Sequence, residues 1–182
     1  MKGGARVWSG LRPGVRWACL AGLLLWCGLA GAWASDLDWV TGRVVSIHDG
    51  DTLKVWDGGQ LHTVRLVAID APERRQAHSQ RARQQLAAAV WQREVRVSYR
   101  KRDRYRRLVG QVWRDGEDVG LALVRGGWAW HYTAYQRDQS LADRLAYAAA
   151  EQEARQHRLG LWADDDPLPP WAFRRQARAA RP

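Results

Sequence analysis

The chain has 182 residues, of which 46% are hydrophobic and 26% are charged, a balance typical of globular proteins and not of disordered or collagen-like ones. Twenty-nine Lys and Arg residues stand against 19 Asp and Glu residues, which gives a formal net charge of +10 at pH 7. A basic surface attracts polyanions, so nucleic acids and anionic lipid headgroups are the partners that this composition favours.

The first 34 residues have the pattern of an export signal. A basic start is followed by an uncharged apolar stretch over residues 17–34, which ends in Ala32, Trp33 and Ala34. Small residues in the first and third of these positions precede a signal-peptidase site, so we expect cleavage after Ala34 and export to the periplasm or the extracellular space. An uncleaved membrane anchor is the alternative, because 18 apolar residues are near the lower limit for spanning a bilayer.

The sequence predicts one domain after this leader. Both cysteines, Cys19 and Cys27, lie within the leader, so the expected domain over residues 35–163 contains no disulfide. Residues 164–182 are rich in Pro and Arg, and we expect them to form a poorly ordered C-terminal tail.

From Trp39 to Arg65 the sequence predicts β structure, in the segments VTGRVVSIH, DTLKVW and LHTVRLVAI. The turn residues HDGD and Asp57-Gly58-Gly59 separate these segments, and Pro72 follows the third. Apolar residues then recur at helical spacing from Ala77 to about Val90, which predicts a helix with one buried face.

Two more strands are expected after this helix, one around residues 95–99 and one over LVGQVW. Asp118 is a suitable N-cap for a short helix through Val124, and Ser140 opens a longer helix that ends before Gly160. We therefore predict an α+β fold that is mainly β, a five-stranded Greek-key barrel of the OB type with about three helices.

Four carboxylates stand beside Gly or Pro at predicted strand ends. Asp49 and Asp51 belong to HDGDT, and Asp70 and Glu73 belong to IDAPE. Two loops of this kind offer the several oxygen ligands that a hard divalent cation such as Ca²⁺ requires. The alternative for HDGDT is a simple hairpin turn, because Asp-Gly is common in such turns.

Two arginines accompany these carboxylates. Arg65 lies among apolar residues in VRLVAI, and Arg107 precedes the last predicted strand. A guanidinium in such surroundings must be paired or face a polar site, and it could hold a phosphodiester beside a cation. Strand parity places Arg65 and Asp70 on opposite faces unless the strand bends, so an outward-facing arginine stays an alternative.

The segments HDGDT, VRLVAIDAPE, DRYRR and ALVRGGWAW together resemble, in this order, the staphylococcal nuclease (thermonuclease) family. The resemblance extends over residues 39–162. It implies that Asp51 and Asp70 ligate Ca²⁺ together with the main-chain carbonyl of Ala71, and that Asp49 supports the ion from nearby.

The same resemblance implies the catalytic residues. Glu73 corresponds to the general base that activates water, and Arg65 and Arg107 correspond to the pair that binds the phosphate and its transition state. His48 and His131 are competing acid-base candidates, but a single histidine in a turn or beside aromatic residues is more often structural.

Two positions depart from the family pattern. Ala71 replaces a threonine, which matters little for a ligand that acts through its backbone carbonyl. Arg106 replaces the glycine before the catalytic arginine, where a positive φ is costly for arginine. Either Arg106 or Arg107 could then reach the phosphate, although Arg107 retains the family's offset from Tyr105.

Aromatic residues supply candidate contacts to nucleotide bases, which stack on such rings. The resemblance implies substrate binding by Tyr105 and by tyrosines of the segment after Gly127. The sequence does not distinguish Tyr132 from Tyr135 in this role.

Together with these patterns, the resemblance implies an exported, monomeric, Ca²⁺-dependent nuclease that hydrolyses DNA and RNA with little sequence specificity. Two alternatives remain at this point: a non-catalytic nucleic-acid-binding module with the same barrel, and a basic surface-attached protein. Attachment to a membrane is expected only if the leader is retained.

Overall fold

The computed structural model describes residues 37–180. The predicted leader and its cleavage after Ala34 lie outside these residues, so both stay predictions, as does the domain boundary that follows them. Within residues 37–180, none of the helices combines the length and the apolar character needed to cross a bilayer.

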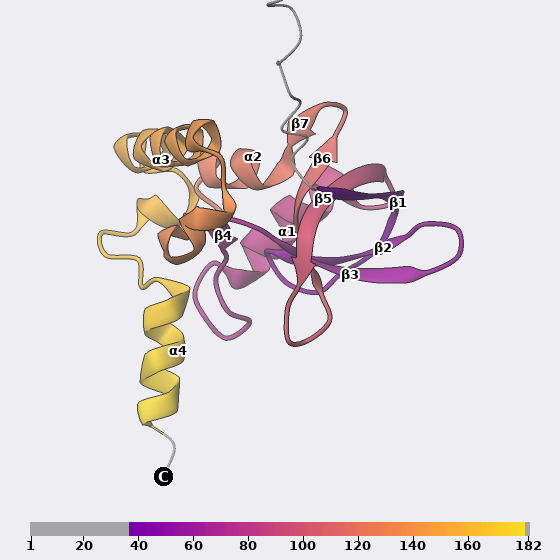
Figure 1. Ribbon diagram of the computed structural model, residues 1–182. Helices are drawn as coiled ribbons and strands as arrows, with labels where there is room; N and C mark the ends of the chain where they lie inside the picture. The colour runs from indigo at the N-terminus through magenta and orange to yellow at the C-terminus, as the bar shows by residue number, and fades with distance from the viewer. Residues whose placement is uncertain (1–36, 181–182) are drawn as a thin grey trace, which may run out of the picture. The chain divides into compact units, whose positions relative to one another are not determined.

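Five strands form a closed barrel (Figure 1). They are β1 (Asp38–Ile47), β2 (Thr52–Trp56), β3 (Leu61–Leu66), β5 (Glu94–Arg102) and β6 (Leu108–Arg114). Antiparallel pairing gives the order β3-β2-β1-β5-β6, and a parallel pairing of β3 with β6 closes the barrel. This arrangement confirms the predicted α+β fold with a five-stranded OB-type barrel.

Three two-residue strands connect the barrel to the rest of the chain. The strand β7 (Glu117–Asp118) extends the sheet beside β6, whereas β4 (Ile69–Asp70) pairs with β8 (Trp130–His131). The second pairing places Asp70 opposite Trp130. It thereby joins the IDAPE loop to the helical half of the molecule.

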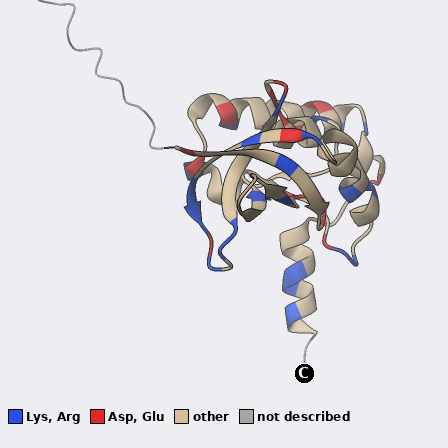
Figure 2. Ribbon diagram, turned by 90° about the vertical axis from the view of Figure 1, so that its right-hand side faces the viewer, with Lys and Arg blue, Asp and Glu red and all other residues tan. Residues whose placement is uncertain are grey.

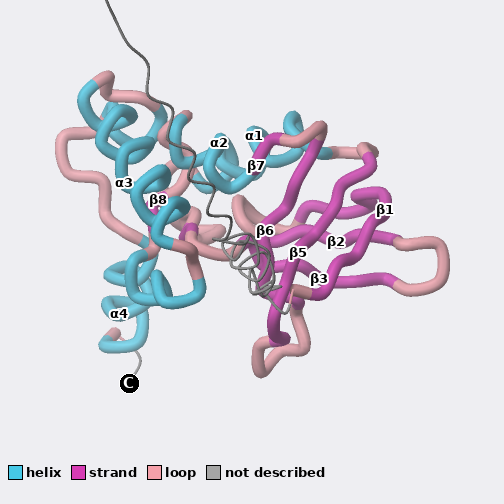
Figure 3. Tube along the Cα trace, turned by 45° about the horizontal axis from the view of Figure 1, so that its top comes forward, coloured by secondary structure: helices cyan, strands magenta, loops and turns pink. Residues whose placement is uncertain are grey.

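The helices gather on one side of the barrel (Figure 3). The three predicted helices are confirmed as α1 (Ser79–Val90), α2 (Val119–Arg125) and α3 (Leu141–Gln156). The side chain of Asp118 caps α2, and that of Ser140 caps α3. Two short 3₁₀ helices follow α2 and α3 respectively, η1 (Thr133–Asp138) and η2 (Gly160–Ala163).

The C-terminal segment differs from its prediction. Residues 164–182 were expected to be poorly ordered, but the structure contains the helix α4 (Pro170–Ala179). Proline is favoured in the first turn of a helix, where its missing N–H has no helical partner, and Pro170 begins this one. The expectation was therefore wrong for these ten residues.

Aliphatic side chains that point inward from alternate strand positions fill the barrel. Each contributes about 1.5 to 3 kcal/mol when fully buried, so the core stabilises the fold without a disulfide. Helices α1, α2 and α3 close this core with their apolar faces. The fully buried barrel residues include Val44, Leu53, Val55, Val64, Val97, Leu108 and Val112.

A buried hydrogen bond joins α3 to the start of α2. The hydroxyl of Tyr147 donates to Oδ2 of Asp118 over 2.7 Å, and Tyr147 is only 1% exposed. Oδ1 of the same carboxylate accepts from the backbone N–H groups of Gly120 and Leu121. Asp118 therefore caps one helix while it anchors another.

Replacing Tyr147 with phenylalanine is expected to lower the free energy of unfolding by about 1.5 to 3 kcal/mol, the range for a hydrogen bond to a charged group. Urea denaturation followed by circular dichroism measures this change. Tyr99→Phe is the matched control, because it removes the hydroxyl of another tyrosine that packs against the same core. Equal stability of the two variants would contradict the prediction.

Candidate active site

The two loops that carry the predicted carboxylates lie against each other. Gly50 makes this approach possible, because a Cβ at this position would lie 2.7 Å from the Cβ of Ala71 and 2.9 Å from that of Ala82. The backbone N–H of Ala71 donates to Oδ2 of Asp51 over 2.8 Å. The HDGDT loop is thus fixed directly to the IDAPE loop.

Arg65 joins the two carboxylates predicted to bind metal. Its Nε lies 3.2 Å from Oδ1 of Asp51, and its Nη2 lies 3.1 Å from Oδ1 of Asp70. Its Nη1 donates to the backbone carbonyls of Leu66 and Ile69. The guanidinium is therefore held at four points, and its orientation does not depend on substrate.

The chain bends between Arg65 and Asp70, which removes the objection from strand parity. Strand β3 ends at Leu66, and Ala68 has a left-handed φ of 66° before β4 begins. The alternation of faces does not continue through such a residue. Arg65 and Asp70 consequently meet, and the outward-facing alternative for Arg65 is wrong.

The donor set suits a hard cation. Asp51 and Asp70 are buried and both face the Arg65 guanidinium, so their oxygens converge on one region. Among residues 37–180, no group of three or more His, Cys, Asp or Glu side chains is arranged to hold a metal ion. A cation here would need backbone carbonyls and water as further ligands, which Ca²⁺ accepts.

Asp49 lies beside Asp51, and its environment disfavours a further negative charge. Burial and the neighbouring charge of Asp51 raise the pKa of Asp49 to about 6. Burial also raises the pKa of Asp70, although Arg174 and Arg65 act in the opposite direction. Crowded carboxylates with raised pKa values are typical of sites that a cation stabilises.

Glu73 lies at the edge of this cluster. It follows Pro72 on the IDAPE loop, and its backbone N–H donates to Oε1 of Gln76 over 3.1 Å. Its side chain is 39% exposed, far more than those of Asp51 and Asp70. Solvent water therefore reaches this carboxylate, as a general base requires.

Arg107 is held by an aspartate that sequence reasoning missed. Its Nε donates to Oδ2 of Asp103 over 2.7 Å, while Oδ1 of Asp103 accepts from the backbone N–H groups of Tyr105 and Arg107. Although burial would raise it, these hydrogen bonds lower the pKa of Asp103. Among the described residues, the Arg107 guanidinium makes no ion pair with Asp51, Asp70 or Glu73. The sequence pattern that indicates this role of Asp103 is an aspartate at the first position of a four-residue turn, where its side chain accepts hydrogen bonds from the following backbone N–H groups.

Arg106 adopts the conformation that the family's glycine would supply. Its φ is 63°, and its N–H donates to the carbonyl of Asp103 over 2.9 Å, so the turn keeps its hydrogen bonds. A left-handed conformation costs a non-glycine residue about 1 to 2 kcal/mol. The strain is thus local to one exposed residue.

Replacing Arg106 with glycine is expected to raise the free energy of unfolding by about 0.5 to 1 kcal/mol, because relief of strain exceeds the added entropy of the unfolded chain. Thermal and urea denaturation measure the change. Arg104→Gly, in the same turn and without a positive φ, should instead lower stability. A loss of stability in both variants would show that Arg106 is not strained.

The predicted tyrosines occupy two places. Tyr105 is 64% exposed at the tip of the hairpin between β5 and β6, within 5.4 Å of the Arg107 guanidinium. Tyr132 and Tyr135 lie together, with ring centroids 5.3 Å apart, and the Tyr132 N–H donates to the carbonyl of Ala68. Both tyrosines that the sequence left undistinguished therefore lie near the IDAPE loop.

The histidine alternatives take no part in the carboxylate cluster. His131 is buried, and its Nε2 lies 2.9 Å from Oε1 of Gln139. His48 is exposed at the end of β1, where its backbone N–H donates to Thr52. The hydrogen bond of His131 supports a structural role.

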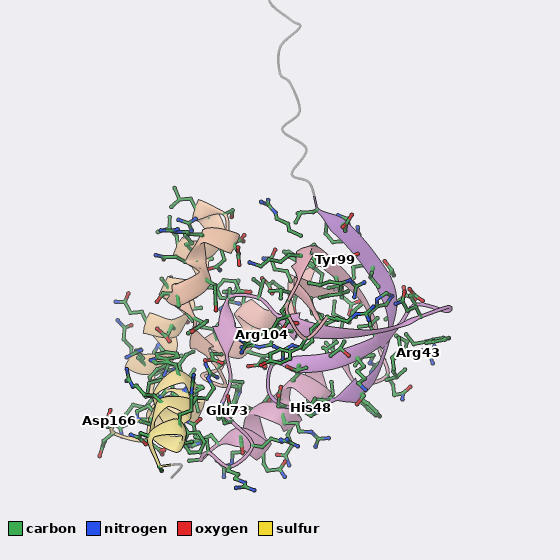
Figure 4. The ribbon with its side chains drawn as sticks, turned by 60° about the horizontal axis from the view of Figure 1, so that its bottom comes forward. Arg43, His48, Glu73, Tyr99, Arg104 and Asp166 are labelled. Carbon is green, nitrogen blue, oxygen red and sulfur yellow. The ribbon has the colours of Figure 1, made fainter. Side chains whose placement is uncertain are left out.

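One residue in the cluster comes from the C-terminal segment that was expected to be poorly ordered. Arg174 of α4 contacts Asp70 and Glu73, and Figure 4 shows Glu73 beside this helix. The sequence signal was the Pro169-Pro170 pair before an aromatic and basic stretch, which is typical of a helix start. The proline and arginine content of residues 164–182 nevertheless led to the prediction of a poorly ordered tail.

The sequence is similar to those of known nucleases. Residues 63–164 match the model of the family described as staphylococcal nuclease homologue. The chain belongs to the staphylococcal nuclease family. Arg65, Asp70, Glu73 and Arg107 lie inside the matched range, whereas Asp51 lies before it and α4 lies after it.

Two relatives of this chain have names that describe nucleases. An "Uncharacterized endonuclease" of Escherichia coli is 42% identical over 136 residues, which are 74% of this chain and 85% of the relative. A "Micrococcal nuclease" of Shigella flexneri is 39% identical over 158 residues, which are 82% of this chain and 86% of the relative. The chain is therefore a nuclease, a hydrolase that acts on phosphodiester bonds.

Proposed function

We propose that this nuclease is exported, depends on Ca²⁺, and cleaves both DNA and RNA with little sequence specificity. The single observation that carries the proposal is the convergence of Asp51 and Asp70 on the guanidinium of Arg65. Cation ligands and a phosphate-binding group are thereby brought together, with Glu73 three residues beyond Asp70.

Asp51, Asp70 and the backbone carbonyl of Ala71 would hold the cation, and Asp49 would support it from nearby. When bound, Ca²⁺ would polarise a phosphate oxygen and offset the negative charge that develops during hydrolysis. The chain prepares this place in advance, because the Ala71 N–H fixes Asp51 and Arg65 fixes Asp70.

Arg65 and Arg107 would bind the non-bridging oxygens of the scissile phosphate. Donors that are already oriented stabilise a developing charge without reorganisation, and removing one such donor costs about 10²- to 10³-fold in rate. Arg65 is oriented by two carbonyls and two carboxylates. Arg107 is oriented by Asp103, which makes Asp103 a positioning residue.

Glu73 would accept the proton of the attacking water. The water oxygen forms a bond to phosphorus while the bond from phosphorus to the 5′ oxygen breaks, and the departing oxygen takes up a proton from solvent. The 3′-phosphate product that this implies follows from the family resemblance. The exposure of Glu73 provides access for water.

The basic hairpin between β5 and β6 supports binding to a nucleic acid backbone. Figure 2 shows Lys and Arg residues along the end of β5 and the following turn, and Tyr105 stands exposed among them. Contacts to phosphates and ring stacking do not select a base sequence. The exposed basic residues of this segment are Arg100, Lys101, Arg102, Arg104 and Arg106.

The test is the release of acid-soluble nucleotides from heat-denatured DNA and from RNA by the purified chain. We expect release with Ca²⁺, weaker release with Mg²⁺, and none with a chelator. Tight binding without release under any metal would instead support the non-catalytic binding module. Equal release in the presence of chelator would overturn the proposed role of the cation.

Export is also proposed, on the leader pattern, together with a monomeric state. Expression in a bacterial host with fractionation should give a periplasmic protein whose mass corresponds to a chain beginning at Ser35. A membrane-bound product of full length would show that the leader is an anchor. Light scattering of the exported protein should give the mass of one chain.

A further inference from the structure

The guanidinium of Arg174 lies between the two acidic groups that the proposed mechanism needs. Its Nη2 donates to Oδ2 of Asp70 over 2.8 Å, and its Nη1 donates to Oε1 of Glu73 over 2.7 Å. A longer contact of 3.2 Å joins Nη1 to Oδ1 of Asp70. One side chain therefore bridges a proposed metal ligand and the proposed general base.

These contacts occupy both oxygens of Asp70. Oδ1 accepts from Arg65 and Arg174, and Oδ2 accepts from Arg174. A carboxylate that ligates Ca²⁺ must turn an oxygen toward the ion, and the ion repels an adjacent guanidinium. Arg65 approaches Asp70 at one oxygen only, so Arg174 is the group that blocks the other.

The helix that carries Arg174 is attached to the nuclease domain beside the site. The ring of Trp171 packs against Tyr132 at 5.5 Å and against Trp130 at 6.4 Å, measured between ring centroids. The side-chain amide of Gln76 donates to the carbonyl of Leu168 just before the helix. Arg174 therefore belongs to a helix that packs against the nuclease domain, and this packing fixes the position of its backbone.

The packing leaves room for Arg174 to move without unfolding the helix. Its side chain is 35% exposed, whereas that of Asp70 is 2% exposed. Apart from the ion pairs of Arg174, the helix is held by Trp171 and the buried Pro170 at its start and by Leu168 just before it. Rotation of the Arg174 side chain toward solvent would therefore release Asp70 and Glu73 together.

We propose that Arg174 is an autoinhibitory latch that competes with the cation for Asp70 and must be displaced for Ca²⁺ to bind. This inference rests on the proposed function, because it takes Asp70 as a metal ligand. Where the binding-competent state is only partly populated, the apparent affinity falls by that fraction. The latch accordingly lowers Ca²⁺ affinity and keeps Glu73 paired until the ion arrives.

The test is titration of the full chain with CaCl₂ by isothermal calorimetry, without nucleic acid. Arg174→Ala is expected to bind Ca²⁺ about tenfold more tightly than the natural chain. Arg178→Ala is the matched control, since Arg178 lies one turn further along α4, is exposed, and within residues 37–180 donates its one side-chain hydrogen bond to the carbonyl of Arg174. Its affinity for Ca²⁺ should not change.

Arg174→Gln provides a second variant that keeps a long polar side chain but removes the charge. It should also tighten Ca²⁺ binding, so the test does not depend on the alanine variant being well folded. Unchanged or weaker Ca²⁺ binding in both variants would overturn the latch.

The two proposals fail in different ways. If the protein binds Ca²⁺ but releases no nucleotides, the proposed function fails, whereas tighter binding by Arg174→Ala still supports the latch. If Ca²⁺-dependent release is observed and Arg174→Ala binds Ca²⁺ no better than the natural chain, only the latch is overturned. The absence of Ca²⁺ binding by every variant would overturn the latch together with the proposed cation.

Discussion

Replacing Arg65 with alanine is expected to lower kcat for DNA hydrolysis by about 10²- to 10³-fold, the cost of removing one oriented donor from a developing oxyanion. The effect should be large because Arg65 is fixed by the carbonyls of Leu66 and Ile69 before any substrate binds. Initial rates on a short single-stranded DNA, at saturating Ca²⁺, give kcat and KM separately.

Two further variants make this result specific. Arg65→Lys keeps the charge but lacks the planar five-donor guanidinium that contacts two carbonyls and two carboxylates, so its kcat should also fall. Arg43→Ala removes an exposed arginine on β1, away from Glu73 in Figure 4, and should keep the natural kcat. Circular dichroism must show that each variant is folded, because Arg65 also pairs with a buried carboxylate. A kcat for Arg65→Ala within a few-fold of the natural value would contradict the role of Arg65.

The barrel could be predicted because its signals are local. Alternating apolar residues defined β1, β2 and β3, and turn residues such as Asp57-Gly58 separated them. Side-chain caps at Asp118 and Ser140 placed the starts of α2 and α3 correctly. In each case the residues that determine the element lie within a few positions of one another.

The cluster around Arg65 was predictable only in part. Strand alternation alone would have separated Arg65 from Asp70, and the left-handed conformation of Ala68 reverses that conclusion. An alanine with a positive φ carries no signal in the sequence, since glycine or asparagine is the usual residue there. Family resemblance supplied what local reasoning could not.

Neither local sequence patterns nor the family resemblance predicted the contacts of Arg174. It is separated from Asp70 by 104 positions and lies outside the range that matches the family. Its place depends on how Trp171 packs against Tyr132 and Trp130, a contact between distant segments. Such packing is specified by shape in three dimensions and has no period or spacing in the sequence.

Arg65 and Arg174 both stabilise the buried carboxylate of Asp70 and affect its binding of a cation. Asp70 is almost fully buried, and a buried carboxylate without a partner is strongly destabilising. Arg65 and Arg174 both pair with it. The same guanidinium groups that make the fold compatible with a buried carboxylate therefore determine how readily a cation can replace them.

Replacing Glu73 with glutamine is expected to lower kcat by about 10²- to 10⁴-fold, the contribution of a general base. Glutamine has nearly the same shape as glutamate but cannot accept the proton of the attacking water. KM should change little, because Glu73 is not among the groups proposed to bind the phosphate. The measurement is the rate of a single turnover on a short DNA with enzyme in excess and saturating Ca²⁺.

Glu94→Gln is the matched control, since it makes the same change of charge at an exposed position at the start of β5. It should cleave at the natural rate. Calorimetry should show that Glu73→Gln still binds Ca²⁺, which separates loss of the base from loss of the cation. If Glu73→Gln kept a near-natural kcat, water would have to be activated by another group, and the base would have to be sought outside the IDAPE loop.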